Sequence, residues 1–166
     1  MDISYDYVLH QATFVPVIEA ATRDAVIEVV TRCVLEPRGY PPDAIAKATT
    51  QVIRRENQGS TGFGKGVAVP RGRCNDIKGI HVGWFTSGIG IDFAALDRAP
   101  VYIVCCVLLP EYDHEEHMRS VQGVVFELLV QDAFRQALRR AETANAMREV
   151  VARALEEGES GEKPVH

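Results

Sequence analysis

The spacing of apolar residues along the chain predicts helices toward both ends and strands between them. From residue 22 to residue 35, apolar side chains recur at steps of three and four, which is the period of one buried helix face. A second helix is expected to start at Asp43, a good N-cap residue, and to run to Asn57, before Gly59. The other helical patterns begin at Glu115, run through Phe134 and Leu138, and span Thr143–Leu155.

The middle of the chain has patterns typical of strands. The segment 101–109 is apolar at every position, which predicts a strand buried on both faces, with Cys105 and Cys106 on opposite sides. A short apolar run, 67–69, is expected to be a buried strand that stops at Pro70, and a third strand is expected around Trp84. The segment 13–17 contains a proline and is predicted as an edge strand. Helices before and after the strands indicate an α/β sandwich with a sheet covered on both faces.

Length and composition limit the classes of protein that fit. A chain of 166 residues with 46% hydrophobic residues predicts one domain over residues 1–155, followed by a flexible polar tail, 156–166. The longest apolar run has nine residues, whereas a membrane helix needs about 20, so we expect no membrane insertion. The net charge of -5 argues against nucleic acid as a partner. Four cysteines without a Cys-x-x-Cys pair, and an acidic start, favour a reducing cytoplasm.

The segment Gly59–Gly66 is rich in glycine and has almost the spacing of a phosphate-binding loop. Gly66 stands where such a loop needs Ser or Thr for magnesium, and here a helical pattern precedes the loop and a strand follows. In a phosphate-binding loop a strand precedes the loop and a helix follows it, because the N-terminus of that helix contacts the phosphates. We therefore exclude nucleotide hydrolysis.

Positive charge is concentrated around this loop. The segment from Arg54 to Lys78 contains six basic and two acidic residues, so it has a local net charge of +4 in a chain that is acidic as a whole. Arginine forks match phosphate and carboxylate oxygens, so the cluster is a candidate anion site; a solvated basic face remains the alternative. The basic residues are Arg54, Arg55, Lys65, Arg71, Arg73 and Lys78.

The histidine-rich segment 113–117 does not predict a metal site. His114 and His117 are three residues apart, which does not match the His-Glu-x-x-His zinc motif. The acidic residues between them suit the first turn of a helix. We expect neither a metal nor another cofactor.

The segment from Arg55 to Pro70 resembles the signature of the IIA domain of the bacterial phosphoenolpyruvate-dependent sugar phosphotransferase system, of the fructose/mannitol and nitrogen-regulatory class. The resemblance covers roughly residues 12–155, including the 91–93 segment and the helix that opens at Glu116 and His117. It implies an α/β three-layer sandwich with a mixed β-sheet between helices. It also implies protein partners: a histidine phosphocarrier protein, a IIB domain or a regulatory target.

The resemblance also implies the site residues. The family's phosphate-accepting histidine falls on Arg71, and its supporting arginine and second histidine fall on Arg55 and His117. A guanidinium has no free lone pair at neutral pH, so Arg71 cannot accept a phosphoryl group. With Arg55 it would favour a bound anion. The expected anion-binding set is Arg55, Arg71, Thr61, Gly62 and Gly64, the last three through backbone amides.

These points predict a IIA-like protein that has lost phosphoryl transfer, the enzymatic activity of the family, and that acts as a regulatory or partner-binding module that can sense an anion. The alternative is an active phosphocarrier for sugar uptake with a displaced acceptor. Cys74 is one candidate, since a basic surrounding should favour its thiolate, and His81 is the other.

Overall fold

A mixed β-sheet forms the centre of the molecule in the computed structural model, which describes residues 2–95 and 97–159. The helical segments are α1 (Ile3–Tyr5), the π-helical turn η1 (Asp6–His10), α2 (Arg23–Leu35), the 3-10 turn η2 (Glu36–Arg38), α3 (Pro42–Gln58), α4 (Glu115–Leu129), α5 (Asp132–Arg140) and α6 (Ala144–Glu159). The strands are β1 (Thr13–Val15), β2 (Gly62–Gly64), β3 (Val67–Ala68), β4 (Arg71–Cys74), β5 (His81–Ile91) and β6 (Val101–Pro110).

The strand order is β1-β5-β6-β3-β2, and β4 also pairs with β6, next to the β3 pairing. The long central strands β5 and β6 are antiparallel, whereas β1 pairs with β5 in parallel, and β3 and β4 pair with β6 in parallel. The sheet is therefore mixed, and β1 lies at its edge as the proline-containing segment predicted.

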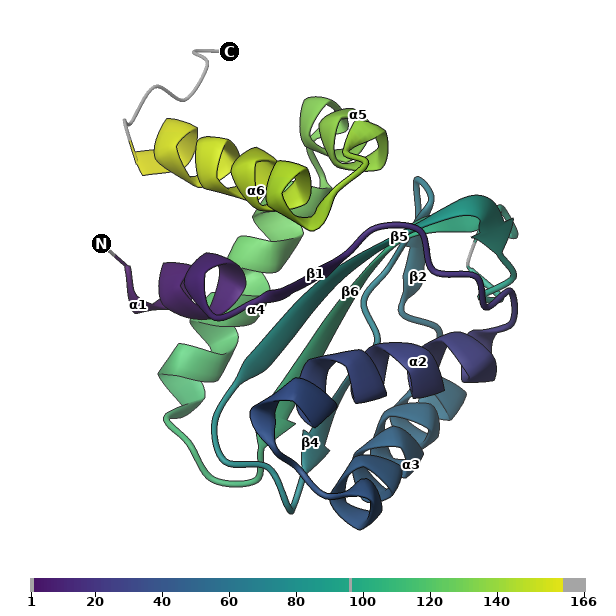
Figure 1. Cartoon of the computed structure of the whole chain (residues 1–166), viewed down its shortest axis with the longest axis vertical. Helices are drawn as coiled ribbons and strands as arrows, with labels where there is room; N and C mark the ends of the chain where they lie inside the picture. Colours follow the sequence, from purple (N-terminus) through teal and green to yellow (C-terminus); the bar gives the residue numbers. More distant parts are fainter. Residues whose placement is uncertain (1, 96, 160–166) are drawn as a thin grey trace.

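Helices cover both faces of this sheet (Figure 1). One core joins the sheet to α2 and α3, and the other joins it to α4, α5 and α6. Cys105 belongs to one core and Cys106 to the other, which confirms that β6 is buried on both faces. The α/β sandwich with a mixed sheet between helices is thus confirmed.

One local prediction was wrong and one strand was missed, and both lie beside a proline. Strand β3 ends at Ala68, before Pro70, as expected, but β4 begins directly after Pro70 and continues along β6, where the sequence predicted no strand. Asp43 is not the N-cap of α3; Pro41 takes that place and Pro42 is the first helical residue. Proline suits a first helical turn because its fixed φ fits and its missing N–H would have no partner there.

The chain ends also differ from the sequence-based picture. The periodicity gave no helix before residue 13, yet residues 3–10 are helical, and Trp84 Nε1 donates to the Val8 carbonyl at 3.0 Å. Helix α6 continues through Glu159, past residue 155 where the polar tail was expected to begin. Residues 160–166 of that tail lie outside the described residues.

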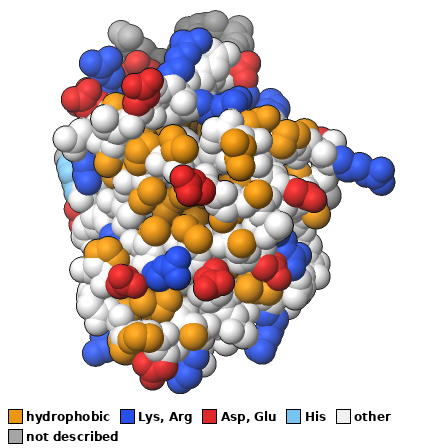
Figure 2. All heavy atoms as spheres, turned by 45° about the vertical axis from the view of Figure 1, so that its right-hand side comes forward, with side chains coloured by type: hydrophobic (Ala, Val, Ile, Leu, Met, Phe, Trp, Pro, Cys, Tyr) orange, Lys and Arg blue, Asp and Glu red, His pale blue; other side chains and the backbone are white. Residues whose placement is uncertain are grey.

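The outer surface is mixed in character. On the side shown in Figure 2, acidic and basic side chains alternate with apolar ones. Within the part of the chain that the structure describes, no helix has the length and apolar character needed to cross a membrane.

Candidate functional site

The site is built on β4, where side chains alternate between the two faces of the sheet. Gly72 faces α3, and a Cβ placed on it would lie 3.2 Å from Val52 Cγ2 and 3.4 Å from the Val52 backbone. The absence of a side chain at Gly72 therefore lets α3 pack closely against β4. Arg71 and Arg73 point to the other face, toward α4, where they contact Gln122 and Glu115.

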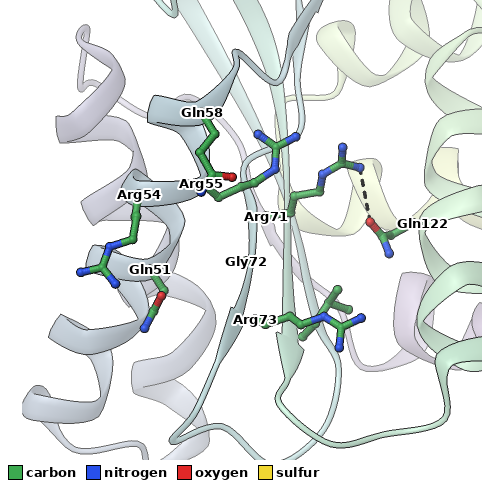
Figure 3. Close-up of a pocket in the computed structure, with 9 residues that line it drawn as sticks. Gln51, Arg54, Arg55, Gln58, Arg71, Gly72, Arg73 and Gln122 are labelled. Carbon is green, nitrogen blue, oxygen red and sulfur yellow. Dashed lines mark hydrogen bonds between the residues drawn. The ribbon is translucent and has the colours of Figure 1, made fainter.

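A pocket of about 370 Å³ opens where β4 passes between α3 and α4 (Figure 3). Arg71 comes from β4 and Arg55 from α3, and their side chains lie next to each other at one end. The charged residues of the lining are all arginines. The described residues that line the pocket are Gln51, Arg54, Arg55, Gln58, Arg71, Gly72, Arg73, Leu109 and Gln122.

Arg71 is held in the pocket by residues of α4. Its Nη1 lies 3.3 Å from Gln122 Oε1, and its guanidinium carbon lies 5.6 Å from the centre of the Phe126 ring. Gln122 in turn donates to the Met118 carbonyl at 3.1 Å, which fixes its amide. The partly buried guanidinium thus has a defined position rather than extending into solvent.

The electrostatics of this pocket favour an anion. Burial lowers the pKa of Arg71, the charge of Arg55 lowers it further, and Glu56 has the opposite effect. Each lowering means that the positive charge of Arg71 is under-compensated in its surroundings. Arg73 is paired with Glu115 at 2.9 and 3.0 Å, and the Arg54 guanidinium points away from Arg71 (Figure 3), so the uncompensated charge beside Arg71 is that of Arg55. A bound anion would relieve the repulsion between these two groups.

The Thr61 and Gly62 backbone amides, which we expected to bind an anion, already have partners within the protein. Glu56 is 2% exposed, and its carboxylate accepts hydrogen bonds from the Thr61 amide at 2.7 Å and the Thr61 hydroxyl at 2.8 Å. The Gly62 amide donates to Ser60 Oγ at 3.0 Å. Gly64 lies in β2, away from the pocket lining. A side-chain carboxylate and a hydroxyl thus take the place that we assigned to an anion.

His117 is likewise absent from the pocket lining in the described part of the chain. Its ring lies against that of His114 near the start of α4, with the ring centres 5.0 Å apart. Gln122, one to two turns further along α4, contacts Arg71 instead. Gln122 and the glutamines of α3, which also line the pocket, were not predicted from the sequence. No motif marks them; only the crossing of α4 over β4 brings Gln122 to the site.

The two candidates for a displaced acceptor lie elsewhere. Cys74 is 2% exposed, and burial raises the pKa of its thiol to about 12, so the expected thiolate is not favoured. His81 Nε2 lies 2.9 Å from the Tyr40 hydroxyl, on the α2 side of the sheet's end. Burial, assisted by the charge of Arg38, lowers the pKa of His81 to about 4. Neither side chain lines the arginine pocket.

The lowered pKa of His81 predicts a loss of stability in mild acid. In the unfolded chain the imidazole protonates near pH 6.5, while in the folded chain it stays neutral until about pH 4. The unfolded state therefore binds more protons between these values, and the free energy of unfolding should fall as the pH drops from 6.5 to 4. We expect His81 to account for on the order of 1–2 kcal/mol of this fall, since the ring is partly solvated.

Urea denaturation of the wild type and of His81→Asn, which cannot titrate in this range, would measure this contribution. The free energy of unfolding of the wild type, relative to that of His81→Asn, should fall steadily as the pH is lowered from 6.5 to 4. A constant difference from pH 7 to pH 4 would contradict the assignment.

A metal centre is not evident: across residues 2–95 and 97–159, no cluster of three or more His, Cys, Asp or Glu side chains could hold an ion.

Comparison with known proteins places these features in a wider group. The family model described as "Phosphoenolpyruvate-dependent sugar phosphotransferase system, EIIA 2" matches residues 8–154. The chain is 36% identical over 100 residues to a nitrogen regulatory protein of Pseudomonas aeruginosa, covering 60% of this chain and 64% of that protein. It is 27% identical over 136 residues to a fructose-specific EIIA component of Haloferax volcanii, covering 82% and 86%.

Solved structures agree in fold. The nitrogen regulatory protein IIA-Ntr of Neisseria meningitidis superposes with a TM-score of 0.76 at 22% identity, over 90% of this chain and 99% of that one. The mannitol IIA protein of Escherichia coli, solved in complex with phosphorylated IIB, gives a TM-score of 0.68 at 17% identity, over 84% and 94%.

Proposed function

Because the chain belongs to the EIIA 2 family of the phosphoenolpyruvate-dependent sugar phosphotransferase system, we propose that it is a regulatory IIA-like protein that no longer transfers phosphate. In this proposal it binds a partner protein through the face that carries the arginine pocket, and it can hold an anion there. The relatives include both a regulatory and a sugar-specific protein, so the family alone does not choose between these roles.

One observation favours a regulatory role without phosphoryl transfer. The position that corresponds to the family's phosphoryl acceptor, by resemblance, is occupied by an arginine whose side chain is held in the pocket. Arg71 lies beside Arg55 and is held by Gln122 (Figure 3). An acceptor must attack phosphorus with a lone pair, and a protonated guanidinium has none to offer. The same group is well suited to bind phosphate or carboxylate oxygens without reacting with them.

The partner is proposed to be a protein of the same phosphotransferase system or one of its regulatory targets. Mannitol IIA was solved in complex with phosphorylated IIB, which supports a protein-binding role for this fold. The four cysteines are unpaired, which suits a protein that works in a reducing cytoplasm.

Incubation with labelled phosphoenolpyruvate, enzyme I and the histidine phosphocarrier protein tests the loss of transfer. We expect the wild-type chain to stay at background label while a sugar-specific IIA protein in the same reaction is labelled. Stable label on any residue of this chain would overturn the proposal. The variants Cys74→Ala and His81→Ala would then show whether either side chain had taken over as acceptor.

A further inference from the structure

A second basic pocket lies at the tip of the glycine-rich hairpin, between the turn that joins β2 to β3 and helix α5. It has a volume of about 380 Å³ and is lined by Lys65, Asp132, Arg135, Gln136 and Arg139. Three of these side chains are cationic and one is anionic, so the pocket has a local charge of +2 within a chain of net charge -5. It shares no lining residue with the pocket around Arg71.

Both arginines of this second pocket are fixed before any ligand arrives. Arg135 is 8% exposed; its Nη1 donates to the Leu129 carbonyl at 2.8 Å, and its Nη2 is paired with Asp132. The Arg139 guanidinium lies over the ring of Tyr102, 4.0 Å from its centre. Guanidinium groups that are already held in place lose little conformational freedom when they bind an anion.

Lys65 adds an independent observation, because its backbone is strained. Its φ is 61°, in the left-handed region that a residue with a Cβ rarely adopts, and it stands between Gly64 at 102° and Gly66 at 76°. A third glycine would make this turn at lower cost. The chain instead carries a lysine whose side chain lines the basic pocket, and strain of this kind is concentrated at functional sites.

We propose that this second pocket binds a dianionic phosphate group, held by Lys65 and Arg139, whereas Arg135 is paired with Asp132 and forms the wall of the pocket. A phosphate with two negative charges would neutralise the local charge of +2. Gln136 supplies a neutral amide donor in the same pocket. The volume also leaves room for the rest of a small phosphorylated molecule.

Nuclear magnetic resonance titration of the ¹⁵N-labelled full chain tests this site. Inorganic phosphate and glucose 6-phosphate are added separately, each against sodium chloride of equal ionic strength. We expect saturable shifts of the backbone amides of Lys65, Gly66 and residues 135–139 with phosphate and none with chloride. Tighter binding of glucose 6-phosphate would identify a phosphorylated metabolite as the natural source, and equal binding would identify free phosphate.

Lys65→Gly separates binding from folding. The change removes one cation and relieves the strained φ, so phosphate affinity should fall about tenfold while the melting temperature stays equal or rises. Arg140→Gln is the matched control, because Arg140 lies on the same helix as Arg135 and Arg139 but lines a different pocket. This variant should bind phosphate with the affinity of the wild type. Arg71→Gln should also leave these shifts intact, which makes the result independent of the first pocket. Shifts that follow chloride, or undiminished affinity in Lys65→Gly, would overturn the proposal.

Discussion

Arg71→His is expected to turn an unlabelled protein into one that takes up phosphate from the histidine phosphocarrier protein. A neutral imidazole has a pKa near 6.5 and offers a lone pair at neutral pH, which the guanidinium does not. Arg55 and Gln122 also line the pocket and can donate hydrogen bonds to the oxygens of a phosphoryl group carried by the new histidine. Label should rise from background toward about one phosphate per chain, measured with labelled phosphoenolpyruvate at pH 7.5.

Arg73→His is the matched control for this gain. Arg73 lies two residues further on the same face of β4 and lines the same pocket, but it is paired with Glu115 and does not occupy the acceptor position. This variant should remain unlabelled. If Arg71→His folds like the wild type and also stays unlabelled, the rest of the acceptor site has not been retained. Label on Arg73→His would show that any histidine in the basic pocket suffices.

The long elements of the fold could be predicted because each buries one or two whole faces. Helix α2 and strand β6 repeat their apolar residues over many positions, so the signal is strong. The restart of the sheet after Pro70, as strand β4, could not be predicted, because it depends on pairing with β6. Pro70 lacks an N–H, but its carbonyl accepts from Val107 at 3.0 Å, which keeps the chain aligned with β6 and lets β4 continue.

Only those parts of the site that depend on residues close together in the sequence could be predicted. The motif identified Arg55 and Arg71, and the structure places both in one pocket, although their anion-binding role stays a prediction. Gln122 and the position of His117 depend on how α4 crosses the sheet, which no local spacing encodes. Similarly, spacing suggested free amides in the glycine-rich loop, whereas Glu56 folds back and uses the amide of Thr61.

Glu56→Ala is expected to destabilise the protein by about 2–4 kcal/mol. The buried carboxylate accepts from both the amide and the hydroxyl of Thr61, which is itself 7% exposed. Without it, two buried donors lose their partner, and each unsatisfied group costs about 1–3 kcal/mol. Urea denaturation at pH 7 would measure the change. Glu28→Ala, at an exposed glutamate of α2, is the control and should stay within about 0.5 kcal/mol of the wild type.

Glu56→Gln is expected to have two effects of opposite sign, because Glu56 both holds the loop and offsets the charge of Arg71. The amide keeps one acceptor oxygen, so the loss of stability should be smaller than in Glu56→Ala, about 1–2 kcal/mol. Removal of the negative charge should at the same time tighten the binding of inorganic phosphate beside Arg71, measured by calorimetry. Weaker phosphate binding in a variant that remains folded would contradict an anion site at Arg55 and Arg71. A stability equal to that of the wild type would mean that the carboxylate does not hold the glycine-rich loop.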